Sequence, residues 1–292
     1  MNHPHPWMPV SPCGAGCLPP ADAVPTVALT RWLLRLLAVA ATLLAALALL
    51  AVLPLVSPAG RERTMRAWYR ALLRALRVQL DVTGGEEFAA PAAGVLVVSN
   101  HMSWLDLIAL CAVQPLRMVA KSEVAGWPVV SLLARQAGTI FVDRERLTTL
   151  PRTVEVASGA LALGAAVGAF PEGTTWCGLA SGRFRPAIFQ AAIDTATSVR
   201  PVALRYRLAG AGATTVAAFV GPTTLWESIL RVAGVQGLVV EVHLLPPLPA
   251  AGTDRRTLAI RAQSTITTVT MPMPAAALNR VLETDCSNSP RI

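Results

Sequence analysis

The sequence of 292 residues has few charged residues and almost no lysine. Charged residues make up 14% of the chain and hydrophobic residues 53%, and Lys121 is the single lysine among 25 cationic side chains. This composition differs from that of a typical soluble enzyme, which has more charged residues, and is closer to that of a membrane protein. The formal net charge of +8 favours an anionic partner, either nucleic acid or anionic lipid.

Cysteine is scarce and forms no recognisable framework. The five cysteines are Cys13, Cys17, Cys111, Cys177 and Cys286. Cys13 and Cys17 form a CxxxC pair, but the sequence has no second pair and no histidine at ligand spacing, so it indicates no zinc site. An odd number of scattered cysteines suits a reducing compartment.

Charge is missing altogether from residues 36–60, which are mostly Leu, Ala and Val. An uncharged run of about 20 residues or more is long enough to cross a bilayer. It begins too far from the N-terminus for a signal peptide. Arginines flank it on both sides, which gives no clear orientation. The run is therefore either a simple span or a helix bent at Pro54 that enters and leaves one leaflet.

An arginine-rich segment follows at residues 65–80. Its cations are spaced as one face of a helix, and its large apolar residues lie on another face. The cations are Arg66, Arg70, Arg74 and Arg77, and the apolar residues are Trp68, Leu72, Leu76 and Leu80. We interpret this segment as an interfacial helix with arginines on phospholipid headgroups and Trp and Leu in the acyl boundary. The alternative is a solvated helix that packs on the domain through its leucines.

From about residue 81, short β-branched runs alternate with helical stretches, which predicts an α/β fold. We expect a mostly parallel or mixed sheet of about seven strands flanked by helices, with membrane-associated helices at the N-terminus. The predicted strands are residues 95–99, 117–120, 139–142, 166–170, 202–206, 216–220 and 239–245. The predicted organisation is a disordered leader (1–29), a membrane-anchoring helical segment (30–80), an α/β domain (81–250), and a C-terminal helix with a frayed tail (251–292).

Two stretches, NHMSWLD (100–106) and FPEGTT (170–175), carry polar residues directly after predicted strands. Reactive groups of such sheets lie at the ends of strands. In NHMSWLD (100–106), His101 can sit in a turn and Asp106 in the first turn of the next helix, so that the two meet. The carboxylate would then fix the tautomer of the ring and leave the other nitrogen as a general base. No G-x-S-x-G nucleophile motif is present, so the His would act on a substrate hydroxyl. A structural His held by a helix-capping Asp, or a metal pair, is the alternative.

These residues resemble the glycerolipid acyltransferase family, which includes lysophosphatidic acid acyltransferases. NHMSWLD matches the H-x4-D signature, and GTIFVDR (138–144), FPEGTT (170–175) and VRPVALRY (199–206) resemble the second, third and fourth blocks. The segment KSEVAGWPVVSLLARQAG (121–138) is also similar. The resemblance covers roughly residues 75–245 with blocks in the same order and spacing.

The resemblance implies roles by position. His101 would be the general base and Asp106 its orienter. Lys121 and Arg144 would face acceptor or donor phosphate, and Glu172, Gly173 and Thr174 would shape the acceptor pocket. The third block departs from the family pattern, because position 175 is Thr where the family usually has an Arg that grips phosphate. Either Arg183 or Arg185 supplies that charge, or the acceptor lacks a phosphate monoester.

The implied function is a membrane-bound acyltransferase of phospholipid biosynthesis. It would move an acyl group from acyl-CoA or acyl carrier protein to a lyso-lipid hydroxyl, with 1-acylglycerol-3-phosphate first and a lyso-ornithine lipid as the alternative. No cofactor or metal is expected. The expected place is the cell membrane, with the catalytic domain on the cytoplasmic face and membrane phospholipid as a partner. A non-catalytic lipid-binding protein of the same fold is the rival class. Nucleic-acid binding is not expected, since the cations cluster beside the apolar run.

Overall fold

The computed structural model describes residues 8–122, 126, 134–143 and 146–271. A mixed sheet of eight strands forms the centre of the molecule, in the order β1-β8-β6-β2-β5-β3-β4, with β7 paired to β6. The strands are β1 (Gln79–Thr83), β2 (Val95–Ser99), β3 (Arg117–Lys121), β4 (Ile140–Val142), β5 (Ala166–Ala169), β6 (Ser198–Leu208), β7 (Gly212–Ala213) and β8 (Leu238–Leu244). Neighbours from β6 to β4 are parallel, whereas β8 runs antiparallel to β6 and β1 runs parallel to β8.

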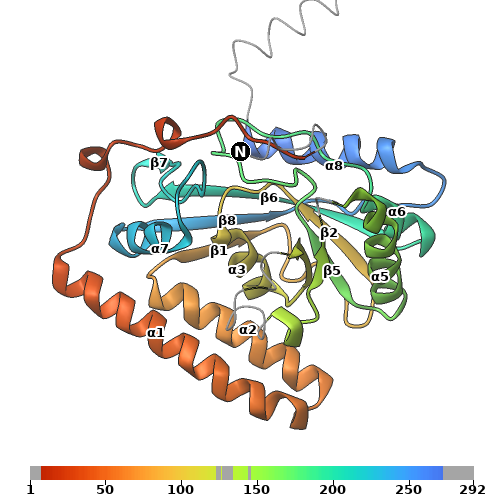
Figure 1. Cartoon of the computed structure of the whole chain (residues 1–292), viewed down its shortest axis with the longest axis horizontal. Helices are drawn as coiled ribbons and strands as arrows, with labels where there is room; N and C mark the ends of the chain where they lie inside the picture. Colours follow the sequence, from red (N-terminus) through yellow and green to blue (C-terminus); the bar gives the residue numbers. More distant parts are fainter. Residues whose placement is uncertain (1–7, 123–125, 127–133, 144–145, 272–292) are drawn as a thin grey trace, which may run out of the picture.

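Helices cover both faces of this sheet, as Figure 1 shows. They are α1 (Leu29–Val52), α2 (Pro58–Ala75), α3 (Trp104–Val113), α5 (Leu150–Ala162), α6 (Phe189–Asp194), α7 (Leu225–Gly234) and α8 (Arg255–Thr270). One apolar core contains residues of α2, α3 and α7, and a second contains residues of α5, α6 and α8. All five residues of β2 are buried, as expected for a central strand covered on both faces. The predicted α/β fold is confirmed.

Two details of the sheet differ from the sequence prediction. The run VAAFV (216–220) is not a strand. It forms a turn and loop in which the N–H of Phe219 donates to the Met102 carbonyl at 2.8 Å. The run is apolar although it is not a strand, because it is a buried loop in which Val216, Ala217 and Val220 are all covered. Conversely, the arginine-rich helix predicted over residues 65–80 ends at Ala75, and its last two residues, Gln79 and Leu80, belong to β1. The chain turns between the two elements at Arg77, which has a φ of 57°.

Helices α1 and α2 form an antiparallel hairpin. The 3-10 turn η3 (Leu53–Leu55) contains Pro54, and Ser57 then caps α2 by accepting from the Gly60 N–H. Halfway along the hairpin, the indole N–H of Trp68 donates to the Thr42 carbonyl at 2.9 Å. The chain therefore reverses direction at the end of the apolar run and returns along it.

The leucine face of α2 packs on the domain, which corrects the interfacial interpretation. Leu72 and Leu76 are buried in the core that α2 shares with α3, and Leu80 belongs to β1. The indole of Trp68 lies against α1. Leu72 and Leu76 are thus unavailable to a membrane, whereas Trp68 and Leu80 are half-buried. The alternative of a helix packed through its leucines holds.

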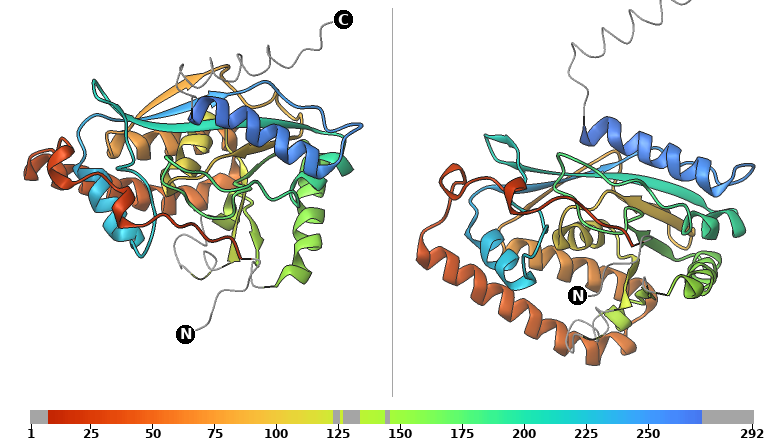
Figure 2. Two further views of the ribbon diagram at one scale, coloured as in Figure 1. Left: turned by 90° about the horizontal axis from the view of Figure 1, so that it is seen from above. Right: turned by 45° about the horizontal axis from the view of Figure 1, so that its top comes forward.

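Residues 8–28 form a segment, here called the strap, that crosses the molecule before α1 (Figure 2). It contains the short turns η1 (Ala15–Cys17) and η2 (Ala21–Ala23). The Thr215 hydroxyl donates to the Cys17 carbonyl at 2.7 Å, and Thr26 pairs with Val235. The prediction of a disordered leader is therefore wrong for these residues, because a segment rich in Pro and Gly can be ordered by contacts that its own sequence does not reveal.

Candidate active site

The loops after β2 and β5 lie side by side at one edge of the sheet. These strands are parallel neighbours, with Val98 level with Ala169, so their carboxyl ends meet. The first loop carries His101 and the second carries Glu172. The sheet thereby joins the two motifs that the sequence shows 71 residues apart.

His101 and Asp106 meet as predicted. The Nδ1 of His101 lies 2.8 Å from the Oδ2 of Asp106. The contact depends on the start of α3, where Ser103 is the N-cap and Asp106 closes a capping box. That box turns the carboxylate back over the preceding turn, toward the histidine.

The Asp106 carboxylate is completely buried and accepts four hydrogen bonds. Its Oδ2 also accepts from the backbone N–H groups of Met102 at 2.6 Å and Ser103 at 2.8 Å. Its Oδ1 accepts from the hydroxyl of Tyr206 on β6 at 2.5 Å. Burial, and next the Asp106 charge, hold the pKa of Tyr206 well above its usual value, so that this hydroxyl remains a donor. The carboxylate is fixed in one orientation.

The imidazole ring of His101 is also fixed, yet it stays accessible. It stacks on Phe170, with ring centroids 3.9 Å apart and an interplanar angle of 6°. The side chain is 21% exposed. When Nδ1–H donates to Asp106, the lone pair of Nε2 is free to accept a proton. The arrangement can therefore act as a general base on a group that approaches from outside.

Glu172 supports the backbone of His101. Its Oε2 accepts from the His101 N–H at 2.7 Å and its Oε1 from the Gly182 N–H at 2.9 Å. The residue is 3% exposed. Burial raises the pKa of Glu172 to about 8, although the two N–H donors act in the opposite sense. Both oxygens are used within the protein, so Glu172 positions the histidine loop.

The residues after Glu172 adopt a tight turn. Gly173 has a φ of +76°, and a side-chain carbon there would lie 2.7 Å from Pro9 of the strap, so glycine is required. Thr174 is half-buried. Thr175, which replaces the family's arginine, donates its hydroxyl to the Phe219 carbonyl. It thus points into the neighbouring loop and offers no charge.

Three of the four predicted cationic residues lie in the part of the chain that the structure describes. Lys121 is exposed at the carboxyl end of β3, and β3 is a parallel neighbour of β5. Arg183 and Arg185 are exposed, and the Nε of Arg185 comes within 3.7 Å of the Cβ position of Gly173. Arg185 therefore reaches back to the Glu172 loop. Arg144 lies outside the described residues.

Sequence reasoning missed three residues that build the site. Tyr206 and Phe170 have been described, and the third is Asn100, whose side chain bridges to the backbone of Leu204 on β6 through two hydrogen bonds at 2.8 and 3.0 Å. Tyr206 carried a signal, because a Tyr at a core-facing strand position needs a partner for its hydroxyl. The roles of Phe170 and Asn100 depend on loop geometry that the sequence does not display.

Comparisons with known proteins agree with these features. A family model described as Acyltransferase matches residues 79–205. The chain is 34% identical to a lyso-ornithine lipid O-acyltransferase of Pseudomonas aeruginosa, over 70% of this chain and 78% of the relative. It is 35% identical to a 1-acyl-sn-glycerol-3-phosphate acyltransferase of Neisseria gonorrhoeae, over 68% and 77%. Its fold resembles the crystal structure of the 1-acyl-sn-glycerophosphate acyltransferase PlsC from Thermotoga maritima, with a TM-score of 0.66, 16% identity and coverage of 85% and 96%.

Proposed function

Because the chain belongs to the acyltransferase family, we propose that it transfers a fatty acyl group from a thioester to the free hydroxyl of a lyso-lipid. The donor is acyl-CoA or acyl carrier protein. The observation that carries this proposal is the contact of 2.8 Å between His101 and a buried Asp106, on a ring that remains partly exposed.

The chemistry requires only these side chains and the two substrates. The Nε2 of His101 removes the hydroxyl proton while the oxygen attacks the thioester carbonyl. Asp106 stabilises the imidazolium that forms. The tetrahedral oxyanion collapses, the C–S bond breaks, and the thiolate leaves with the proton that His101 returns. Binding both substrates together supplies proximity, so no acyl-enzyme is needed.

The relatives act, by their names, on two kinds of lyso-lipid acceptor. These acceptors differ in whether they carry a phosphate that needs a positive charge near Gly173. With 1-acylglycerol-3-phosphate, Arg185 would bind the phosphate in place of the arginine absent at position 175. This is the acceptor we favour, since Arg185 is exposed and reaches the Glu172 loop. A lyso-ornithine lipid is the second candidate, supported by the hydrogen bond that ties Thr175 to the Phe219 carbonyl.

A panel of lyso-lipid acceptors tests both the proposed acyl transfer and the choice of acceptor. The purified full-length protein is offered lyso-lipids with and without a phosphate monoester, each with palmitoyl-CoA and with palmitoyl-carrier protein, and released thiol is measured. Arg185→Ala should raise KM for the phosphate acceptor at least about tenfold, since a charge-assisted contact is lost, with Arg255→Ala on α8 as the matched control. Transfer to the ornithine acceptor alone would reverse our choice of acceptor. A protein that binds lyso-lipid but releases no thiol would be the non-catalytic binder.

The proposed place is the cell membrane, with the catalytic domain at its cytoplasmic face. Residues Leu29–Leu55 are long and apolar enough to cross a membrane by length and composition. Most of this surface is uncovered, since only Val39 and Ala46 of α1 are buried. Leu34, Leu37 and Leu44 are each about two thirds exposed, at 64%, 67% and 66%. Such a patch is typical of a membrane contact.

The hairpin favours an arrangement within one leaflet over a simple span. The contact between Trp68 and Thr42 places the adjacent Arg66 and Arg70 of α2 beside the middle of α1. If α1 stood upright across the bilayer, these arginines would lie near its centre, where charge is costly. An α1 that lies in the interface, with α2 on its domain side, avoids this cost.

A groove between α1, α2 and β1 supports the same placement. It has a volume of about 1420 Å³, and its lining includes six arginines and one carboxylate, Asp81. The arginines are Arg31, Arg35, Arg70, Arg74, Arg77 and Arg207. Six arginines against one carboxylate leave the lining of this groove with unbalanced positive charge. Anionic headgroups would supply the missing negative charge.

Membrane attachment can be tested by removing exposed apolar groups of α1. A triple variant, Leu34→Gln, Leu37→Gln and Leu44→Gln, should move much of the protein from the membrane pellet to the supernatant. The matched control places glutamine at three other exposed apolar positions, Val156, Leu163 and Leu179. Undiminished sedimentation with membranes would contradict the proposed role of α1.

A further inference from the structure

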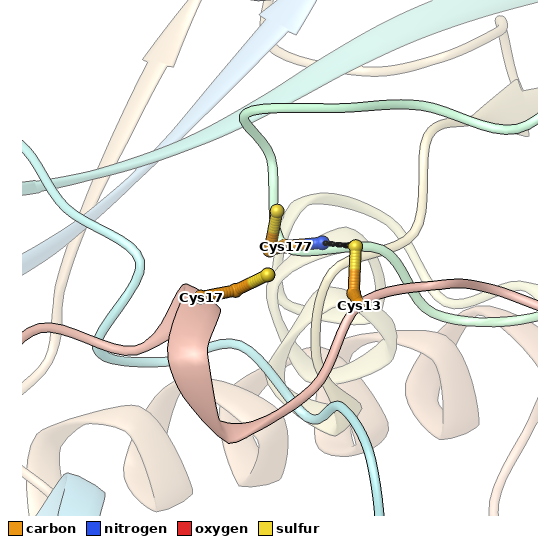
Figure 3. A group of neighbouring side chains, drawn as sticks. All are labelled: Cys13, Cys17 and Cys177. Carbon is orange, nitrogen blue, oxygen red and sulfur yellow. Dashed lines mark hydrogen bonds between the residues drawn. The ribbon is translucent and has the colours of Figure 1, made fainter.

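Three cysteines gather beside the active-site loop and take no part in the proposed acyl transfer. The Sγ atoms of Cys13, Cys17 and Cys177 lie within 4.8 Å of one another. Figure 3 shows the sulfur of Cys17 directed toward Cys177, and the N–H of Cys177 donating to the Sγ of Cys13, at 3.4 Å. Cys17 is the last residue of the single turn η1 and Cys13 lies just before that turn, whereas Cys177 lies in the loop that follows Glu172.

The surroundings of these sulfurs are apolar and nearly closed. Cys13 and Cys177 are 8% and 2% exposed, and Ala218 and Val220 pack with them. Cys17 is half-buried, which leaves one side open to an incoming ion. All three are free thiols. Converging thiolates in such a setting are typical ligands of soft metals, zinc among them.

We propose that Cys13, Cys17 and Cys177 bind one zinc ion through three thiolates, with water in the fourth position. Zinc–sulfur bonds of about 2.3 Å in a tetrahedral site place sulfurs about 3.8 Å apart. The cluster therefore needs to contract by about 1 Å at most. Binding releases the three thiol protons to solvent, and no redox change is involved.

A bound zinc ion would link the strap to the loop that follows Glu172. The backbone N–H of Trp176, which precedes Cys177, donates to the His101 carbonyl at 2.8 Å. On the strap side, the Cys17 carbonyl accepts from Thr215, and Pro9 packs over Gly173. A bound ion would fix all of these contacts together. Its role is structural, and CxxxC alone could not reveal it because the third ligand is remote in sequence.

Metal binding to the full-length protein in detergent tests this site. Protein stripped of metal under reducing conditions is titrated with zinc, and with cadmium to follow the sulfur-to-metal absorption. We expect one equivalent in the wild type and at least about 100-fold weaker binding in Cys17→Ser. Cys111→Ser is the matched control and should keep full binding. Cys111 is a buried free thiol in α3, within the core that contains residues of α2, α3 and α7.

Protease protection provides a readout that is independent of acyl transfer. Zinc should slow cleavage within residues 8–28 in the wild type and leave the rate unchanged in Cys17→Ser, which replaces a half-buried side chain and should fold. Absence of stoichiometric metal, equal binding by Cys17→Ser, or a disulfide among these cysteines in freshly purified protein would each overturn the proposal. Thiol release from the donor measured on the same samples reports separately on the proposed function.

Discussion

The hydroxyl of Tyr206 helps to hold the Asp106 carboxylate in the orientation that contacts His101. This hydroxyl is the only side-chain donor to Oδ1 of Asp106 among the described residues. We expect Tyr206→Phe to lower the free energy of unfolding by about 1.5–3 kcal/mol, since a bond to a charged group is lost in the core. Denaturant titration measures this change. It should also lower kcat more than it raises KM, because Tyr206 acts through Asp106.

Tyr69→Phe serves as the comparison, because Tyr69 is also buried but lies in α2 and makes no hydrogen bond to Asp106. If Tyr206→Phe changed stability and kcat no more than Tyr69→Phe, the hydrogen bond to Asp106 would have no special role.

Glu172 makes stability depend on pH. Because its pKa in the folded protein is raised to about 8 from a usual 4.5, the folded state holds a proton that the unfolded chain loses between these values. Stability is therefore greatest below pH 4.5 as far as this group is concerned. It falls as pH rises, by at most about 1.4 kcal/mol per pH unit, and levels off above pH 8.

Urea titrations of the wild type and Glu172→Gln between pH 5 and 9 would measure this dependence. We expect the difference between the two proteins to change with pH in the stated direction, since the glutamine does not titrate. A pH-independent difference would mean that Glu172 is ionised throughout this range.

At the scale of elements, α2 contributes to the core of the domain. Leu72 is buried between α2 and the domain, while Arg74 on the same helix is exposed. We expect Leu72→Ala to cost about 2–5 kcal/mol of stability and Arg74→Ala to cost less than about 0.5 kcal/mol. Thermal and denaturant unfolding would measure both. A Leu72→Ala protein of unchanged stability but weaker membrane binding would instead support the interfacial interpretation of α2.

The same helix illustrates how far sequence reasoning reaches. The spacing of Leu72 and Leu76 predicted an apolar face, but a pattern cannot say whether that face meets lipid or protein. Strands such as β2 and β5 were predicted because buried β-branched runs have few alternatives. By contrast, VAAFV is similarly apolar but forms a loop, which is buried through contacts with the strap and the histidine loop. His101 and Asp106 were predicted because they share one short turn, whereas Tyr206 reaches them only through the sheet.

For the molecule as a whole, we expect the N-terminal hairpin to combine an anchoring role with a folding role, which truncation can separate. Deleting residues 1–80 removes α1, α2 and the first residues of β1, so we expect a poorly soluble or weakly active protein. Deleting residues 1–56 keeps Ser57, which caps α2, and should leave a folded domain with weaker membrane attachment. Circular dichroism and membrane sedimentation distinguish the two. A soluble, fully active protein without residues 1–80 would contradict this division.

The central claim is that His101, oriented by Asp106, removes a proton from the acceptor hydroxyl. The most direct measurement is thiol release from palmitoyl thioester with lyso-lipid, by the wild type and by His101→Ala, with folding checked by circular dichroism. General-base catalysis contributes about 10²–10⁴-fold, so the account predicts a loss of at least about 10²-fold with an unchanged fold. Acyl transfer by folded His101→Ala at a rate near that of the wild type would contradict it.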